Sequence, residues 1–154
     1  MKEDYDGAEP SGNSVALMNL LRLAQITNRE DLKRSADQLV AAFAPRLTAA
    51  PVALPEMLAA CEFRFAEPRQ IILVGDREAE DTRLLLRTLH SKFMPHRIVL
   101  LVDSPETRAA LSKDIPAIAS MEPKEGHATA YVCRNYSCQM PVTEVGAFAE
   151  LIQY

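Results

Sequence analysis

The sequence predicts an α/β protein in which a helical segment precedes a subdomain with the element order β-α-β-α-β-β-α. In residues 1–67, apolar side chains recur at helical spacing, whereas residues 68–154 contain two continuous apolar runs rich in Ile and Val, at 70–75 and 97–103. Because a helical pattern separates these runs, we expect two parallel strands joined by a right-handed crossover. We therefore divide the chain into a helical segment, 1–67, and an α/β subdomain, 68–154.

The first two helices of the helical segment follow from their start signals. The turn sequence EPSGNS (9–14) should begin the first helix, which then runs to about Ile26. Thr27 and Glu30 have the spacing of a capping box, so we expect them to begin the second helix. The sequence favours no single end for this helix, because it contains Pro45 and is followed by further prolines.

A third helix is expected in LPEMLAACEFRF (54–65), with Pro55 in its first turn. Its apolar residues recur at helical spacing and should form one buried face, made of Leu54, Met57, Leu58, Cys61 and Phe65.

The first helix is apolar nearly all round, because its polar positions after the first turn are few: Asn19, Arg22 and Gln25. A helix of this kind is buried on most of its faces. In a chain of 154 residues we expect it to leave a large apolar patch exposed. We therefore predict that the isolated chain forms a dimer or a helix-swapped oligomer.

The α/β subdomain should contain three further helices and a hairpin. A helix is expected over about 78–92, and Ser104 followed by Pro105 has the pattern of a second helix start. The strands ATAYVC (128–133) and CQMPV (138–142) should form the hairpin. Thr143 is then expected to cap a last helix.

Cys133 and Cys138 are expected to flank a four-residue hairpin loop. The spacing allows a disulfide, but we favour two unlinked, partly buried residues, with a redox pair as the alternative. A zinc site would need two more ligands, and only His127 is near in sequence, so we predict neither a metal nor a cofactor.

The third cysteine, Cys61, lies on the predicted core face of a helix. An odd cysteine count suits a reducing compartment better than a disulfide scaffold.

The composition excludes several classes of function. The formal net charge is -4 and the basic residues are scattered, so a nucleic-acid partner is not expected. The longest apolar run, 15–24, is too short and too interrupted to span a membrane. The acidic start of the chain has no apolar core of a signal peptide. We therefore expect a cytoplasmic protein without a membrane partner.

The predicted element order is also that of a thioredoxin-like fold, whose reactive cysteines follow the first strand at a helix N-terminus. Here that place holds GDREAED (75–81), which contains no cysteine. The segment also lacks the glycine pattern of a dinucleotide loop, so Asp76 and Asp103 are interpreted as loop and capping residues. Binding of a small molecule at the carboxyl ends of the strands 70–75 and 98–103 remains a third hypothesis.

Several motifs resemble the spermatogenesis-associated protein 20 family, whose bacterial members are described as thioredoxin-domain or N-acylglucosamine 2-epimerase-like proteins. The similarity covers nearly the whole chain, and its most specific parts are PSGNS (10–14) and AYVCRNYSCQMPVT (130–143). The resemblance implies a longer parent with an N-terminal thioredoxin-like domain and an (α/α)6 toroid like that of six-hairpin glycosidases. This chain would be the last toroid helices and a C-terminal α/β unit, and its partner would be the missing N-terminal part.

The resemblance also implies where a site would lie. The 9–14 loop would face the central bowl of the toroid, with Glu9, Ser11 and Asn13 as candidate polar lining residues, although we favour simple helix capping for Ser11. The parent would act on carbohydrate, as an epimerase or a hydrolase. Such chemistry needs an acid and a base around the substrate, so we expect this fragment to be structural and catalytically inert alone. The alternative is a redox accessory domain that uses Cys133 and Cys138.

Overall fold

A computed structural model describes residues 4–153. A first compact unit ends at Glu67, and a second begins at Pro68. The first unit is helical and the second contains a four-stranded mixed sheet, so the predicted α/β class is confirmed. The elements are α1 (Gly12–Thr27), α2 (Glu30–Ala49), η1 (Pro51–Ala53), α3 (Pro55–Phe65), β1 (Arg69–Val74), α4 (Glu80–His90), β2 (Arg97–Val102), α5 (Pro105–Leu111), η2 (Pro116–Ser120), β3 (Thr129–Arg134), β4 (Ser137–Cys138) and α6 (Val145–Leu151).

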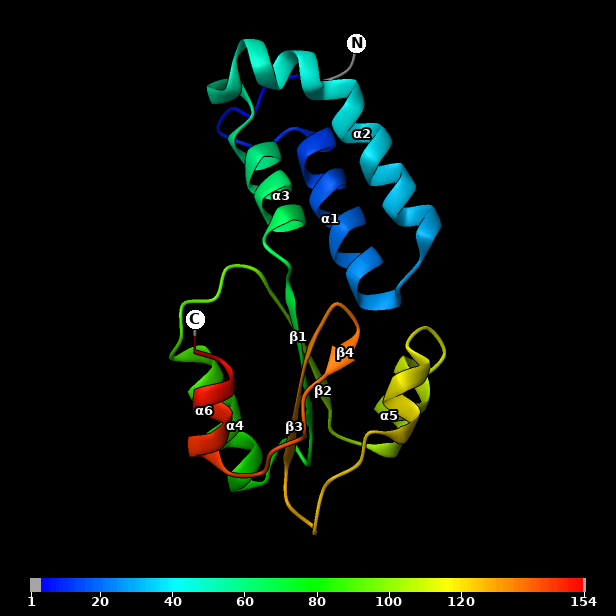
Figure 1. The fold of residues 1–154 in the computed structure, drawn as a ribbon, viewed down its shortest axis with the longest axis vertical. Helices are drawn as coiled ribbons and strands as arrows, with labels where there is room; N and C mark the ends of the chain where they lie inside the picture. The colour runs from blue at the N-terminus through cyan, green and yellow to red at the C-terminus, as the bar shows by residue number, and fades with distance from the viewer. Residues whose placement is uncertain (1–3, 154) are drawn as a thin grey trace. The chain divides into compact units, whose positions relative to one another are not determined.

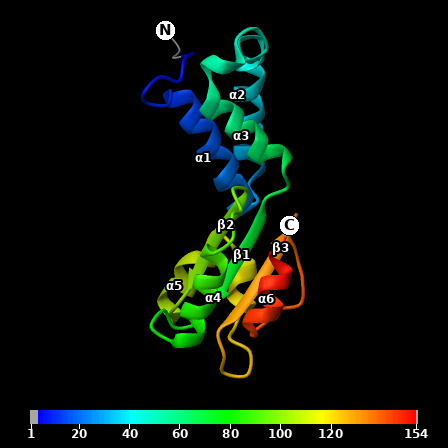
Figure 2. The same ribbon diagram turned by 90° about the vertical axis from the view of Figure 1, so that its left-hand side faces the viewer.

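In the helical unit, α1 packs against both α2 and α3 (Figure 2). Ser11 caps α1 by accepting a hydrogen bond from the Ser14 backbone N–H. The buried face of α1 is narrow and consists of Ser14, Leu17, Leu21 and Ala24. Neither α1 nor any other helix within residues 4–153 is long and apolar enough to cross a membrane.

The predicted capping box at the start of α2 is wrong. Thr27 is the last residue of α1, and its hydroxyl donates to the carbonyl oxygen of Leu23 at 2.7 Å. Arg29 occupies the N-cap position of α2, where its side chain pairs with Asp31 and does not cap the helix, while Glu30 forms an ion pair with Lys33 at 2.6 Å. Thr27 therefore ends α1 and does not begin α2, because its hydroxyl bonds to a carbonyl oxygen of its own helix.

The buried face of α3 differs from the predicted one. Leu54 at its N-cap and Met57 are buried as expected, but the other buried helix positions are Ala60 and Phe63. Leu58 and Phe65, which were expected to face inward, are exposed, and Cys61 is half-buried. The helix thus carries a second apolar stripe that the unit itself does not cover.

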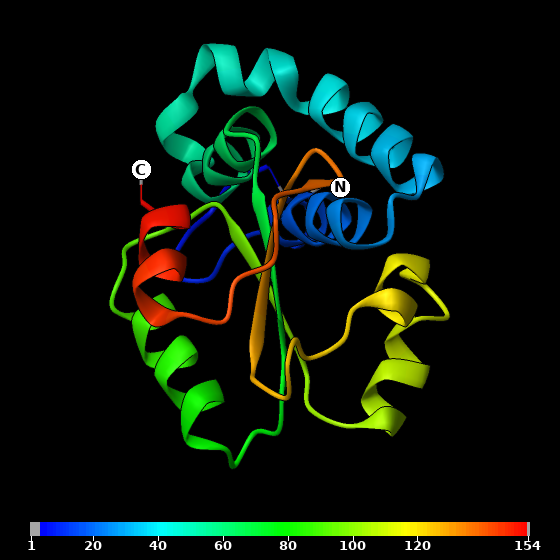
Figure 3. The ribbon, with the colours of Figure 1, turned by 60° about the horizontal axis from the view of Figure 1, so that its bottom comes forward.

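The sheet has the strand order β2-β1-β3-β4. β1 pairs with β2 in parallel and with β3 in antiparallel orientation, and β4 pairs antiparallel with β3. Figures 1 and 3 show α4 and α6 on one face of the sheet and α5 on the other. The α/β unit therefore has the predicted element order β-α-β-α-β-β-α.

Each face of the sheet has its own apolar core. The core on the α4 and α6 face includes Ile71, Leu73, Leu85, Leu89, Ala130, Val132 and Phe148. The core on the opposite face includes Ile72, Val74, Val102, Ile118, Tyr131 and Cys133. Alternate residues of β1 enter the two cores, which explains why this strand reads as a continuous apolar run.

The hairpin is tighter than predicted. Its loop contains only Asn135 and Tyr136, and both have positive φ angles, 49° and 62°. Positive φ at both central residues is the geometry of a type I′ turn, which matches the twist of the two strands. The last helix also differs, because α6 begins after Glu144 and has no side-chain cap, so the predicted cap at Thr143 is wrong.

Candidate functional site

The hairpin carries a disulfide between Cys133 and Cys138, where we favoured two unlinked cysteines. The two residues are direct partners in the β3–β4 register, so their side chains leave the hairpin on the same face. Because the loop has two residues and not the predicted four, both cysteines are paired residues of the β3–β4 ladder and do not directly flank the loop. The disulfide therefore closes the end of the sheet at its shortest strand.

The two sulfur-bearing residues have different surroundings. Cys133 is 2% exposed and packs in the core that contains Ile72 and Tyr131. Cys138 is exposed on β4. Because an attacking thiolate needs access to one sulfur, Cys138 is the accessible end of this bridge.

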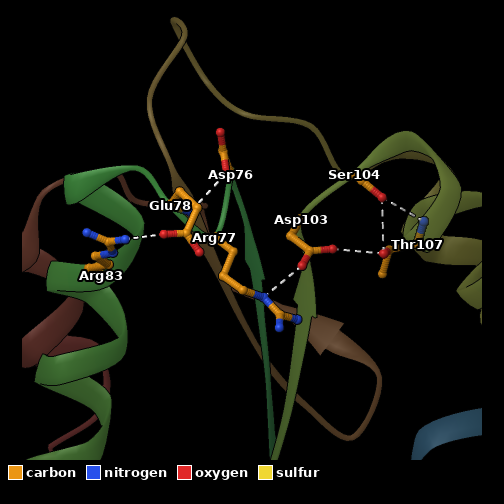
Figure 4. A network of polar contacts seen from close by, with 7 residues as sticks. All are labelled: Asp76, Arg77, Glu78, Arg83, Asp103, Ser104 and Thr107. Carbon is orange, nitrogen blue, oxygen red and sulfur yellow. Dashed lines mark hydrogen bonds and ion pairs between the residues drawn. The ribbon is translucent and has the colours of Figure 1, made fainter.

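The carboxyl ends of β1 and β2 are joined by a polar network (Figure 4). Arg77, just after β1, pairs with Asp103, just after β2, with 2.9 Å between Nε and Oδ2. The hydroxyl of Thr107 donates to Oδ1 of Asp103 at 2.8 Å. The Thr107 hydrogen bond, together with Arg77, lowers the pKa of Asp103. Ser104 completes the network by accepting from the Thr107 backbone N–H, which caps α5.

The loop after β1 is also engaged within the chain. Asp76 accepts a hydrogen bond from the Glu78 backbone N–H at 2.9 Å, and Glu78 forms an ion pair with Arg83 of α4 (Figure 4). In a thioredoxin-like fold this loop carries the reactive cysteines. Here it consists of charged residues bonded to one another.

Below this loop the packing is close. A Cβ atom on Gly75 would lie 2.6 Å from the Thr82 hydroxyl and 2.8 Å from Cβ of Ala128, so only glycine fits. Asp81 holds the same junction, since it accepts from the backbone N–H groups of Ala128 and Thr82, each at 2.8 Å. These bonds, with the Ala128 contact first, and the nearby His127 lower the pKa of Asp81. The space beside the start of α4 is therefore filled by the chain itself.

A buried carboxylate that the sequence did not reveal organises the helical unit. Asp6 accepts from the backbone N–H of Ser11 at 2.8 Å, before α1. Its other oxygen accepts from the N–H groups of Glu56 at 2.9 Å and Met57 at 3.4 Å, in the first turn of α3. Because Glu56 lies 50 positions away, no local motif could have identified this contact. The N-termini of two helices thus share one anion.

The candidate bowl residues lie beside this carboxylate in sequence. Glu9 is exposed in the turn before α1, where its carbonyl oxygen accepts from the Gly7 N–H at 3.1 Å. Ser11 is buried and is the cap of α1, whereas Asn13 is half-buried in the first turn of that helix. Residues 4–153 contain no group of three or more His, Cys, Asp or Glu side chains arranged to hold a metal ion.

No protein-family model matches the chain, and no solved structure is significantly similar to it. Spermatogenesis-associated protein 20 of Homo sapiens is 40% identical over 144 residues, which is 94% of this chain and 18% of the human protein. The chain is similar to one segment of spermatogenesis-associated protein 20. The family member of Mus musculus is 39% identical over the same length, and an uncharacterised protein of Caenorhabditis elegans is 34% identical over 152 residues, or 98% of this chain and 20% of that protein.

The resemblance drawn from the motifs is therefore confirmed. The chain spans about a fifth of the length of these relatives, and their names state no substrate, cofactor or reaction. A thioredoxin-like domain, a toroid and a carbohydrate substrate stay predictions for the members of the spermatogenesis-associated protein 20 family. The cytoplasmic location stays a prediction as well.

Proposed function

We propose that this chain is a structural segment of a longer protein and that its helical unit packs against the remaining part of that protein. The observation that carries the proposal is the second apolar face on two of its helices. Relatives about five times longer than the chain supply a candidate for the surface that covers this face.

The uncovered face comes from α1 and α3, which pack against each other. On α1, Val15 is 42% exposed and Leu23 is 48% exposed. On α3, Leu58 is 39% exposed and Phe65 is 75% exposed. Scattered apolar residues on a surface need no explanation. Leu58 and Phe65, however, lie on the same stripe of α3, with half-buried Cys61 between them. Such a stripe is typical of a helix that contacts a partner.

The same proposal makes the isolated chain catalytically inert. Epimerisation or hydrolysis of a sugar needs an acid and a base on opposite sides of the substrate. Glu9 is exposed in a turn, and the nearest buried carboxylate, Asp6, is already bonded to backbone N–H groups. If the parent acts on carbohydrate, the catalytic pair comes from its other segments. We expect no epimerase or glycosidase activity from the chain alone.

The proposal is tested by producing this chain and the remainder of its parent separately and measuring their binding. We expect the two to associate, and the double variant Leu23→Gln, Phe65→Gln to weaken binding by tenfold or more because it places polar groups on the contact face. Leu84→Gln is the matched control, since Leu84 is an exposed leucine of the α/β unit. The proposal is overturned if the chain stays monomeric and does not bind the remainder of the parent. If the chain associates with itself and does not bind the remainder, the proposal is also overturned, and the partner of this surface is a second copy of the chain.

A second candidate function is thiol–disulfide exchange through Cys133 and Cys138, and the disulfide favours it. Disulfides in reducing compartments are usually transient, catalytic or redox-sensing. If the chain is cytoplasmic, the bridge would then serve exchange instead of stability. One buried and one exposed cysteine gives an incoming thiolate a single point of attack.

In this exchange a thiolate attacks Sγ of Cys138, the bond between the two sulfurs breaks, and Cys133 leaves as a thiolate that takes a proton. A second thiol then attacks the mixed disulfide, which releases an external disulfide and the reduced pair. The chain gains two electrons and two protons, and two external thiols are oxidised.

Equilibration in glutathione buffers, followed by alkylation and mass spectrometry, tests this candidate. Cys61→Ala is the background, because Cys61 is the free cysteine among the described residues and burial raises the pKa of its thiol. We expect Cys133 and Cys138 to convert together at a potential between about -270 and -120 mV, the range of thiol oxidoreductases. A potential below about -300 mV is that of a structural disulfide and would remove this candidate.

A further inference from the structure

The sheet ends on one side in β2, which pairs with β1 alone. Within residues 4–153 no strand lies beyond it, because β2 is the first strand in the order β2-β1-β3-β4. β2 has six residues, RIVLLV, and all of them after Arg97 are apolar. A long apolar edge strand presents a row of backbone groups that can pair with another chain.

The hydrogen bonds to β1 identify the backbone groups of β2 that face outward. The Arg69 N–H donates to the carbonyl oxygen of His96 at 3.1 Å, just before β2. Because the direction of backbone groups alternates along a strand, the even-numbered positions of β2 bond to β1. The N–H and C=O groups of Arg97, Val99 and Leu101 therefore point away from the sheet. Within residues 4–153 they have no backbone partner.

The opposite edge of the sheet is better protected. β4 has only two residues, Ser137 and Cys138, and its cysteine is linked to β3 by the disulfide. Pro141, which has no N–H to donate, follows shortly after. Short edge strands and prolines prevent pairing with other chains. β2 contains neither feature, so it is the edge that is open to a partner.

The side chains of β2 are also incompletely covered. Val99 and Leu101 pack at the margin of the core under α4 and α6, and Leu100 packs at the margin of the opposite core. All three are half-buried. A strand added at this edge would remove more of their apolar surface from water on both faces of the sheet.

The two ends of β2 differ in charge. Residues 82–102 contain no Asp or Glu, and Lys92 and Arg97 lie at the start of the strand. At its carboxyl end, segments 76–81 and 103–106 are rich in Asp and Glu and contain one basic residue, Arg77. An antiparallel strand of the same sequence would place the basic start of each copy against the acidic end of the other. This charge complementarity favours a second copy of the chain as the partner.

We propose that β2 pairs antiparallel with β2 of a second copy, around a two-fold axis at Val99. In this register Val99 is opposite Val99 of the second copy, and Arg97 is opposite its Leu101. All outward-facing residues then form hydrogen-bonded pairs, because odd-numbered positions meet odd-numbered positions. Arg97 also lies diagonal to Asp103 of the second copy, within reach of a long side chain. A two-fold interface is closed, so association ends at the dimer.

This pairing goes beyond docking to the parent and does not rest on it. β2 belongs to the α/β unit, whereas the docking face belongs to α1 and α3. The double variant Leu23→Gln, Phe65→Gln weakens association through the docking face, so it serves as the background for every measurement. Failure of the strand pairing is thereby distinguished from failure of the docking.

Cysteine cross-linking in the whole chain, with Cys61→Ala added, tests the register. Directly opposite, hydrogen-bonded residues have Cα atoms about 5.5 Å apart, which a disulfide can bridge. We expect mild oxidation to link Val99→Cys to itself, as a covalent dimer on a non-reducing gel. Leu101→Cys is the matched control on the same strand and face, because its two copies lie about 14 Å apart along the strand. It should link to Arg97→Cys when the two variants are mixed, and not to itself.

Sedimentation equilibrium measures the strength of the pairing. Val99→Lys places like charges opposite each other at the axis, so it should weaken self-association by about tenfold or more, and Val99→Glu should do the same. A mixture of the two variants should restore association, because the opposite charges then meet. Met140→Lys is the control, since Met140 is an exposed apolar residue after β4, away from β2.

The proposal is overturned if the background chain is monomeric at high concentration, or if Val99→Lys and Met140→Lys weaken association equally. It is also overturned if Val99→Cys does not link to itself, or if Leu101→Cys links to itself as readily. If Val99→Lys does not fold, as judged by circular dichroism, the cross-links decide the same question.

Discussion

The two units differ in how they cover their apolar side chains. Helices lie over both faces of the sheet, and residues Ile71, Ile72, Leu73 and Val74 of β1 are all 0 to 3% exposed. In the helical unit, α1 and α3 bury one face each and leave apolar side chains on another. The α/β unit thus buries the apolar side chains of its central strand, although Leu84, Phe93 and Met140 at its surface are exposed. The helical unit has more apolar surface than its three helices can bury, which is the basis for the proposed docking to the parent.

The largest expected effect tests this contrast directly. Phe148→Ala truncates a side chain that is 0% exposed in the α/β core, and we expect it to lower the free energy of unfolding by about 3–5 kcal/mol. Leu23→Gln, on the uncovered face of α1, should change the free energy of unfolding by less than about 0.5 kcal/mol. Urea unfolding measures both values. Equal losses in the two variants would remove the distinction between the units.

The next effect concerns the polar junction of the helical unit. Burial raises the pKa of Asp6, but hydrogen bonds from Ser11, Ser14 and Glu56 together hold it below the ordinary value of 3.8. Since the folded state binds this proton more weakly than the unfolded state, Asp6 stabilises the fold fully above about pH 3.8, and this contribution declines as the pH falls through the lowered pKa. Acid therefore weakens the junction.

Asp6→Asn removes the charge with little change of shape. We expect a loss of about 1.5–3 kcal/mol near neutral pH, the range for hydrogen bonds to a charged group, and a smaller loss in acid. Urea unfolding across the pH range measures it. The control is Asp114→Asn, which removes an exposed carboxylate from the α/β unit. A loss that does not depend on pH would show that the charge of Asp6 is not what joins α1 and α3.

A similar junction exists in the α/β unit at Gly75. Gly75→Ala places a methyl group against Thr82 and Ala128, so we expect a loss of about 1–3 kcal/mol from overpacking. Thr82→Ala, which removes a buried hydroxyl without a hydrogen-bond partner among residues 4–153, should recover part of that loss in the double variant. A double-mutant cycle by urea unfolding measures the coupling. Strict additivity would mean that the two side chains do not compete for space.

The smallest effect is a gain. Tyr136 adopts a φ of 62°, a conformation that costs an L residue about 1–2 kcal/mol. Tyr136→Gly should therefore raise the free energy of unfolding by about 0.5–1 kcal/mol, less the contacts of the lost ring. Asn135→Gly is the comparison, with a smaller gain, because asparagine tolerates this region. Differential scanning calorimetry measures both shifts in Tm, and a lower Tm for Tyr136→Gly would contradict the turn geometry.

The sequence predicted the strands and helices where periodicity was strong. The β1 and β2 runs were recognisable because apolar side chains of both strands pack on both faces of the sheet. The prediction of the buried face of α3 was partly wrong, because Leu58 and Phe65 are exposed. Leu58, Cys61 and Phe65 would have the same helical spacing whether the surface that covers them belongs to this chain or to another. Periodicity identifies an apolar stripe, and it does not identify the surface that covers it.

The candidate sites were less accessible to sequence reasoning. The hairpin was recognised, but its two-residue turn was not, because tyrosine is an unusual residue at a positive φ. Asp6 and Asp81 accept hydrogen bonds from backbone N–H groups 50 and 47 positions away in the sequence, so no local sequence motif indicated either contact. The pairing of Arg69 with Arg134 depends on the β1–β3 register, which the sequence alone does not determine.

The shared carboxylate has a practical consequence for shortening this chain. Asp6 lies outside every helix, yet both α1 and α3 begin on its oxygens, and its own backbone N–H donates to the carbonyl oxygen of Ala53 at 2.7 Å. A truncation that started at Gly12 would retain all of α1 and still detach the first turns of two helices. Expression trials that place the new terminus at a helix boundary would therefore discard the residue that fastens them.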